Sequence, residues 1–63
     1  MEKLSYKELE KQTLNYGKNI FGDEEKFDKW LSHNSIHLGD KPVNLMKTYD
    51  GLNIVLDELM NYH

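Results

Sequence analysis

Hydrophobic positions recur at helical spacing along most of the chain, and no stretch alternates in the manner of a half-buried β-strand. The first helical stretch follows Ser5, which has Glu8 three residues later and so matches a capping box. Leu9, Tyr16 and Ile20 then share one helical face at spacings of seven and four. The pattern therefore predicts a helix that begins just after Ser5.

Two glycines bear on where this first helix ends. Gly22 suits the left-handed position just past a helix C-terminus. Gly17 lies earlier, where it either ends the helix or is tolerated at a cost of about 1 kcal/mol relative to alanine. Asp23 is the expected N-cap of a second helix. The buried face of that helix, at spacings of three and four, consists of Phe27, Trp30 and Leu31.

The segment 32–41 is predicted to be a loop, in which Ile36 and Leu38 fill apolar space. Pro42 then suits the first turn of a third, short helix, because its missing N–H has no partner there in any case. We expect the apolar face of this helix to consist of Leu45, Met46 and Tyr49. Asp50 and Gly51 are expected to interrupt the helical pattern.

The last stretch has the clearest amphipathic spacing, with apolar residues at i, i+3, i+4, i+7 and i+8. These residues are Leu52, Val55, Leu56, Leu59 and Met60. The sequence thus predicts an all-α fold, a compact bundle of about four short helices. Its expected core contains Phe27, Trp30, Leu31, Leu45, Leu52, Val55, Leu56 and Leu59.

Composition and charge exclude several kinds of function. A chain of 63 residues has room for one small core. With no cysteine it has neither a disulfide nor a cysteine-based zinc site. Its net charge is −3 and its cations are all lysines, so we expect no direct binding to nucleic acid. It has neither a bilayer-spanning apolar stretch nor a secretion signal, so we expect a cytoplasmic protein that makes no use of a membrane.

The candidate chemical groups are sparse. His33 and His37 are four residues apart and Asp40 is nearby. On a helix this spacing can hold zinc, but these residues lie in a predicted loop, where it does not by itself bring the two side chains to the same side. We therefore favour a surface role for both histidines and expect no bound metal. Ser5 has no histidine near it in sequence, and the acidic residues match helix starts and solvated faces. We expect no catalytic residue and no cofactor.

An ordered series of short motifs runs through the chain from residue 19 onward. The motifs are Ile20-Phe21-Gly22, Trp30-Leu31, Asn34, Leu38-Gly39, Pro42, Leu45-Met46, Thr48, Gly51, Val55 and Leu59. In this order and spacing they resemble the toxin-binding domain of Xre/MbcA/ParS-type antitoxins. The chain departs from that family's pattern at Phe27, where the family usually has alanine, and at Asp40, which replaces the second of two glycines.

The resemblance implies a specific function. Such domains bind a toxin of the RES type, an enzyme that consumes NAD, and block its active site. We therefore expect residues 1–63 to form a single helical domain, in which 19–63 correspond to the toxin-binding domain and 1–18 add a helix. Residues 1–18 are too few for the helix-turn-helix that family members commonly carry.

The same resemblance implies that the C-terminal segment approaches the toxin. Apolar residues in excess of what a small core can bury also favour an interface. The expected toxin-binding residues are Tyr49, Ile54, Met60, Asn61, Tyr62 and His63. Two alternatives stay open: a self-associating or adaptor domain with another protein partner, and half of a repressor whose DNA-binding part is a separate chain.

Overall fold

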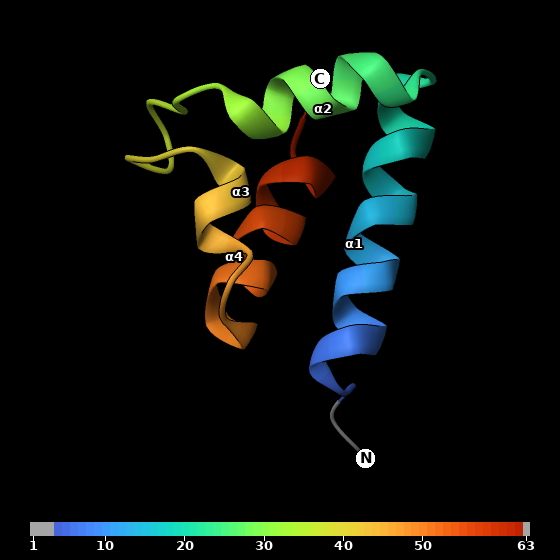
Figure 1. Cartoon of the computed structure of the whole chain (residues 1–63), viewed down its shortest axis with the longest axis vertical. Helices are drawn as coiled ribbons and strands as arrows, with labels where there is room; N and C mark the ends of the chain where they lie inside the picture. The colour runs from blue at the N-terminus through green and yellow to red at the C-terminus, as the bar shows by residue number, and fades with distance from the viewer. Residues whose placement is uncertain (1–3, 63) are drawn as a thin grey trace.

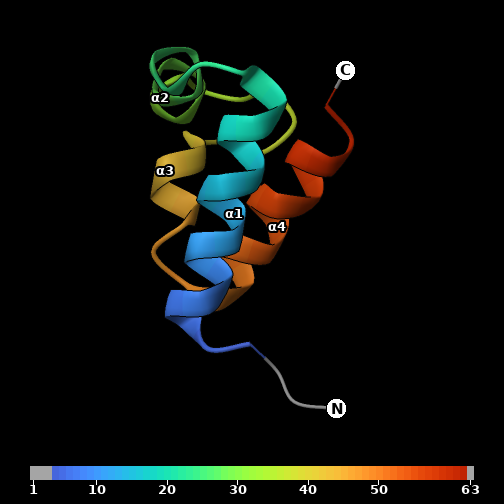
Figure 2. The same ribbon diagram turned by 90° about the vertical axis from the view of Figure 1, so that its right-hand side faces the viewer.

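The computed structural model describes residues 4–62, in which it contains four helices and no β-strand. The helices are α1 (Tyr6–Phe21), α2 (Glu24–Ser32), α3 (Pro42–Leu45) and α4 (Tyr49–Met60). This confirms the prediction of an all-α bundle. The longest helices, α1 and α4, lie side by side and run in the same direction, while α2 crosses one end of the pair (Figures 1 and 2). The short helix α3 packs against α2 and α4.

The two ends of α1 have the chemistry that the sequence predicts. The Glu8 backbone N–H donates to the Ser5 hydroxyl and the Ser5 N–H donates to the Glu8 carboxylate, each at 3.2 Å. The hydrogen bond from the Ser5 N–H, with a smaller contribution from the Ser5 side chain, lowers the pKa of Glu8. At the other end Gly22 has φ +69° and its N–H bonds the Lys18 carbonyl at 2.8 Å. Gly17 lies inside the helix and does not end it.

Gly17 allows α1 and α2 to approach closely. The aromatic ring of Phe27 lies against its Cα, where a Cβ atom would come within 2.2 Å of two ring carbons. Any larger residue at position 17 would force the ring or the helix to move. Phe27 is thereby one of the most buried side chains of the chain, with 1% of its surface exposed. The bulk of Phe27 is compensated by the absence of a side chain at Gly17.

The expected boundary between the last two helices is wrong. Tyr49, Asp50 and Gly51 form the first turn of α4, and they do not extend or interrupt α3. The physical reason is Thr48, whose hydroxyl accepts a hydrogen bond from the Gly51 N–H at 3.0 Å and caps the helix. Helix α3 ends at Leu45, so only three residues connect the two helices.

The core forms where the apolar faces of all four helices meet. Five of the expected core residues are buried, namely Phe27, Leu31, Leu52, Val55 and Leu59. Trp30, Leu45 and Leu56 are partly buried and pack against this cluster. Leu9, Met46 and Thr13 are buried as well, although they were not among the expected core residues. The Thr13 hydroxyl is satisfied inside α1, because it donates to the Leu9 carbonyl at 2.7 Å.

Candidate functional site

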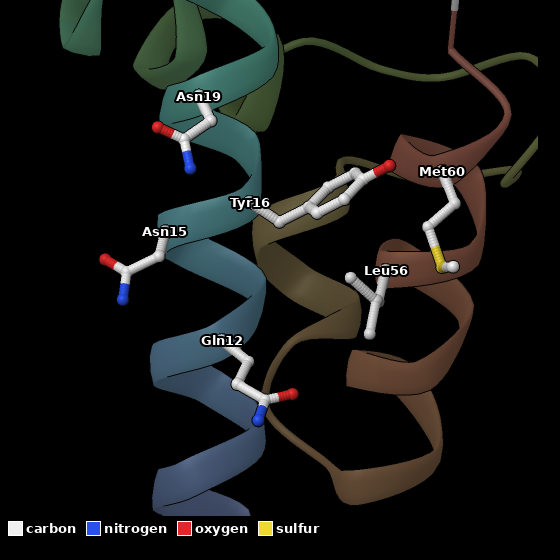
Figure 3. Close-up of a pocket in the computed structure, with 6 residues that line it drawn as sticks. All are labelled: Gln12, Asn15, Tyr16, Asn19, Leu56 and Met60. Carbon is white, nitrogen blue, oxygen red and sulfur yellow. The ribbon is translucent and has the colours of Figure 1, made fainter.

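An open groove lies between α1 and α4 on one side of the bundle (Figure 3). Its volume is about 400 Å³, and its lining consists of Gln12, Asn15, Tyr16, Asn19, Leu56 and Met60. Tyr16 reaches from α1 toward α4 and remains 38% exposed, while Met60 is 59% exposed on the opposite wall. The groove thus offers apolar surface to another molecule.

The groove is uncharged in a chain that is otherwise rich in charge. None of its lining side chains is ionisable near neutral pH, whereas 30% of all residues are Asp, Glu or Lys. The carboxamides of Gln12, Asn15 and Asn19 form no hydrogen bond with any other part of residues 4–62. These amide groups are therefore available as both donors and acceptors to a partner.

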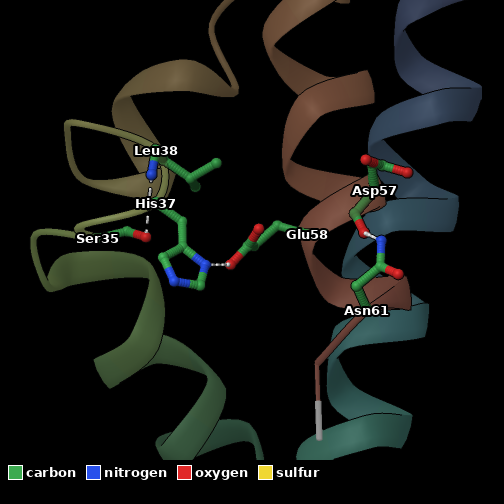
Figure 4. A network of polar contacts seen from close by, with 6 residues as sticks. All are labelled: Ser35, His37, Leu38, Asp57, Glu58 and Asn61. Atoms are coloured by element: carbon green, nitrogen blue, oxygen red, sulfur yellow. Dashed lines mark hydrogen bonds and ion pairs between the residues drawn. The ribbon is translucent and has the colours of Figure 1, made fainter.

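The two described residues that follow α4, Asn61 and Tyr62, are both held by contacts with the helices. Asn61 closes the last turn of α4, because its side-chain amide donates to the Asp57 carbonyl at 2.8 Å (Figure 4). The ring of Tyr62 then packs on Phe21 and Trp30, with centroid distances of 4.9 and 6.4 Å. Tyr62 still has 43% of its surface exposed. It therefore presents a positioned aromatic side chain to solvent.

The structure brings together only part of the expected toxin-binding set. Met60, Asn61 and Tyr62 are consecutive and exposed at the C-terminal end of α4. Tyr49, by contrast, is half-buried in the first turn of α4 and packs against the core. His63 lies outside the described residues.

Ile54 is exposed on a different side of α4. Because each residue advances about 100° around an α-helix, Ile54 lies about 120° from Met60 and about 160° from Leu56. It is 49% exposed, and three of its four neighbours at spacings of three and four are acidic, namely Asp50, Asp57 and Glu58. Ile54 and Met60 therefore lie on different sides of α4.

The two loop histidines have separate surroundings. His33 is the C-cap residue of α2. The Nδ1 atom of His37 lies 3.1 Å from a carboxylate oxygen of Glu58, which ties the loop to α4 (Figure 4). Among residues 4–62, no group of three or more histidine, aspartate or glutamate side chains is arranged to hold a metal ion. The contact with Glu58 thus gives His37 a role in holding the loop against α4.

The expected apolar role of Ile36 is wrong, since 97% of its surface is exposed. The loop is held instead by its own hydrogen bonds. The N–H groups of Ser35 and Gly39 bond the carbonyls of Asp40 and Ser35 at 3.1 and 2.8 Å. The Asp40 carboxylate accepts the Lys41 N–H at 2.6 Å and the Asn44 amide at 3.2 Å, and these bonds lower the pKa of Asp40. This internal bonding holds the tight turn and leaves Ile36 in solvent.

The groove itself was not predicted from the sequence. Gln12, Asn15 and Asn19 recur at i, i+3 and i+7 and hence follow one face of α1. A run of polar but uncharged residues on a helix face is a usable sign of an interface, because solvated faces of this chain carry lysine and carboxylate side chains. The aromatic contact between Phe21, Trp30 and Tyr62 has no comparable spacing signature, since it depends on the tertiary fold.

Comparison with known protein families gives one match. The model described as the antitoxin Xre/MbcA/ParS C-terminal toxin-binding domain matches residues 17–62. The matched segment begins at Gly17 and contains α2, α3 and α4 in full. No curated protein and no solved structure matches the chain. Within residues 4–62, no helix has the length and apolar character required to cross a membrane.

Proposed function

The chain belongs to the family of Xre/MbcA/ParS antitoxin C-terminal toxin-binding domains, and from this we propose that it binds and neutralises a protein toxin. The observation that carries the proposal is the family match over residues 17–62, which takes in the last turn of α1 and the whole of the other three helices. We further propose that the toxin is a RES-type enzyme that consumes NAD, and that the encounter takes place in the cytoplasm.

The proposed toxin-contacting surface is the C-terminal end of α4. Asn61 and Tyr62 extend the chain beyond the helix, and Met60 lies one residue before them. Tyrosine is enriched among the residues that dominate binding energy at interfaces. The ring of Tyr62 is already held in place by its contact with Phe21. Little side-chain freedom is therefore lost when a partner covers it. Ile54 would add a second, separate contact on the acidic face of α4.

The proposed mechanism is occlusion and requires no reaction by this chain. The Tyr62 phenol, followed by His63, would enter the mouth of the toxin's active-site cleft. There the hydroxyl and the groups that follow it can occupy polar positions that otherwise hold NAD. The rate of the toxin's reaction then depends on the fraction of toxin bound, and no catalytic residue or cofactor of this chain is involved.

Removal of Tyr62 and His63 is expected to weaken inhibition of the toxin at least about tenfold. The free energy of unfolding should fall much less, by about 0.5–1.5 kcal/mol, because the removed tyrosine is partly exposed and contributes only its two ring contacts, with Phe21 and Trp30. Inhibition constants from NAD-consumption assays and urea denaturation followed by circular dichroism measure the two effects.

The matched control is Tyr62→Phe, which keeps the ring on Phe21 and loses only the hydroxyl. This variant should fold as the unmodified chain does and show intermediate inhibition. Identical inhibition constants for the truncated and unmodified chains would remove the C-terminal end from the proposed mechanism.

The proposed function is tested by affinity capture of the tagged chain from its native host, with identification of the retained protein and an assay of its activity. We expect a partner that degrades NAD when released and does not when bound. A partner with no effect on NAD would favour the alternative, an adaptor domain of the same fold.

A further inference from the structure

Ile36 stands out among the apolar side chains that the structure describes, because it is almost completely exposed. Water reaches 97% of its surface, whereas the other exposed large hydrophobic side chains of residues 4–62 have 37–59% of theirs exposed. A single exposed apolar residue is ordinary on a protein surface and needs no partner to explain it. Ile36 differs because the turn that carries it, residues 35–40, is held in one conformation by several contacts.

Hydrogen bonds close this turn on both sides. The backbone of Ser35 pairs with that of Asp40, and the Ser35 hydroxyl accepts a hydrogen bond from the Leu38 N–H at 3.3 Å. The Asp40 carboxylate accepts a hydrogen bond from the Asn44 side-chain amide at 3.2 Å, which ties the end of the turn to α3. Leu38 is partly buried, whereas Ile36 is not. Burial of Ile36 within this chain would therefore require the turn to open.

The turn is also fastened to α4. The Nδ1 atom of His37 lies 3.1 Å from the carboxylate of Glu58, which belongs to the last turn of that helix (Figure 4). The segment 33–41 and the C-terminal end of α4 lie at the same end of the bundle, the end that α2 crosses (Figures 1 and 2). The turn is therefore on the same end of the molecule as the proposed toxin-contacting surface.

This arrangement makes Ile36 suitable as an anchor for a partner. The backbone around it is ordered before a partner arrives, so little conformational entropy is lost on binding. Complete burial of an isoleucine side chain strengthens association by about tenfold to a hundredfold. Ile36 has nearly its whole surface left to bury, so almost all of this contribution is available for binding.

The shape of the surface restricts what can cover it. The segment 33–41 projects beyond α2 and α3, so an apolar side chain on it is buried best in a concave surface (Figure 1). In a two-fold pair of copies the same patch meets itself. Two projecting turns that meet in this way would leave much of both isoleucine side chains in water. These features favour a different protein, with an apolar pocket, as the occupant.

We propose that Ile36 is a further anchor on the toxin, and that it fills an apolar pocket beside the part of the toxin that Tyr62 contacts. The inference rests on the proposed function for the identity of the partner. It adds a contact from the segment between α2 and α3, away from the end of α4. Because the pocket has to match the size and shape of an isoleucine, this turn also contributes to the choice among related toxins.

The test is the affinity of the purified full chain for the toxin obtained by affinity capture, measured by isothermal titration calorimetry. Ile36→Ala removes the apolar contact and should raise the dissociation constant about tenfold or more. Ile36→Val keeps most of the side chain and should stay within about fivefold of the unmodified value. Both variants should keep the unmodified midpoint of urea denaturation, because the side chain at position 36 is exposed.

The matched control is Lys7→Ala, which truncates an exposed side chain at the start of α1, far from the turn (Figure 1). Its dissociation constant should remain within about twofold of the unmodified value. A second comparison combines Ile36→Ala with the truncation that lacks Tyr62 and His63. If both contacts are made independently to one toxin, the two fold-losses should multiply.

A dissociation constant for Ile36→Ala within about twofold of the unmodified value would overturn the inference. The proposed function would survive that result if the unmodified chain still suppressed NAD consumption. If Ile36→Ala weakened binding to a captured protein that does not consume NAD, the toxin would be wrong as the occupant and neutralisation would fail with it. Self-association that Ile36→Ala abolishes would assign the side chain to a second copy and overturn the inference. Capture of no protein at all would overturn both proposals.

Discussion

Replacing Phe27 with alanine is expected to cost about 3–5 kcal/mol of unfolding free energy and to leave much of the protein unfolded in water. The phenyl ring is almost completely buried at the junction of α1 and α2. It fills the space that Gly17 leaves open and stacks on Phe21 and Trp30 at centroid distances of 5.7 and 6.1 Å. A domain of this length has little stability in reserve, so one large core cavity is expected to dominate.

Urea denaturation followed by circular dichroism measures this loss. Lys26→Ala is the matched control, since it truncates an exposed side chain in the same helix and should change stability by less than about 0.5 kcal/mol. An unfolding midpoint for Phe27→Ala close to that of Lys26→Ala would show that the ring does not hold α2 in place.

Gly51→Ala is expected to destabilise the protein by about 1–3 kcal/mol, although glycine-to-alanine changes in open helix interiors usually stabilise by about 1 kcal/mol. The reversal follows from the tight connection between α3 and α4. A Cβ atom on Gly51 would lie 1.6 Å from the Leu45 carbonyl oxygen, which is backbone and cannot move without shifting α3. The Thr48 cap of α4 would be displaced as well, because its hydroxyl lies 3.0 Å from the same Cβ position.

The control for this prediction is Asp28→Ala, at an exposed position inside α2. It should stabilise by about 0.5 kcal/mol, since alanine favours the helix more than aspartate does. Thermal unfolding of both variants gives the comparison. A stabilised Gly51→Ala variant would mean that α3 and α4 are not in close contact at Leu45.

Local chemistry explains which parts of the fold could be predicted. The Ser5 capping box and the Gly22 terminus use residues adjacent in sequence, and both form as expected. Position 51 was misjudged because a glycine inside a helix resembles a break when only propensity is considered. The need for glycine there arises from Leu45 in another helix, and that contact is visible only in three dimensions.

In the candidate site, too, features that depend on a single helix could be predicted from the sequence, and features that depend on the packing of two helices could not. The exposure of Met60 agrees with the expectation that a small core cannot bury every apolar residue of the last helix, and Tyr62 is exposed beyond the end of that helix. The sequence could not separate Ile54 from Met60, because an excess of apolar residues does not indicate how many surfaces they form. The groove depends on the packing of α1 beside α4, which no spacing within either helix determines.

The most direct test of toxin neutralisation is a titration of the captured toxin's NAD consumption with the purified, unmodified chain. The proposed function predicts that the rate falls to background as the chain approaches a fixed stoichiometric ratio, and that the truncation lacking Tyr62 and His63 requires a much higher concentration. A rate of NAD consumption that stays constant while the two proteins form a stable complex would contradict neutralisation.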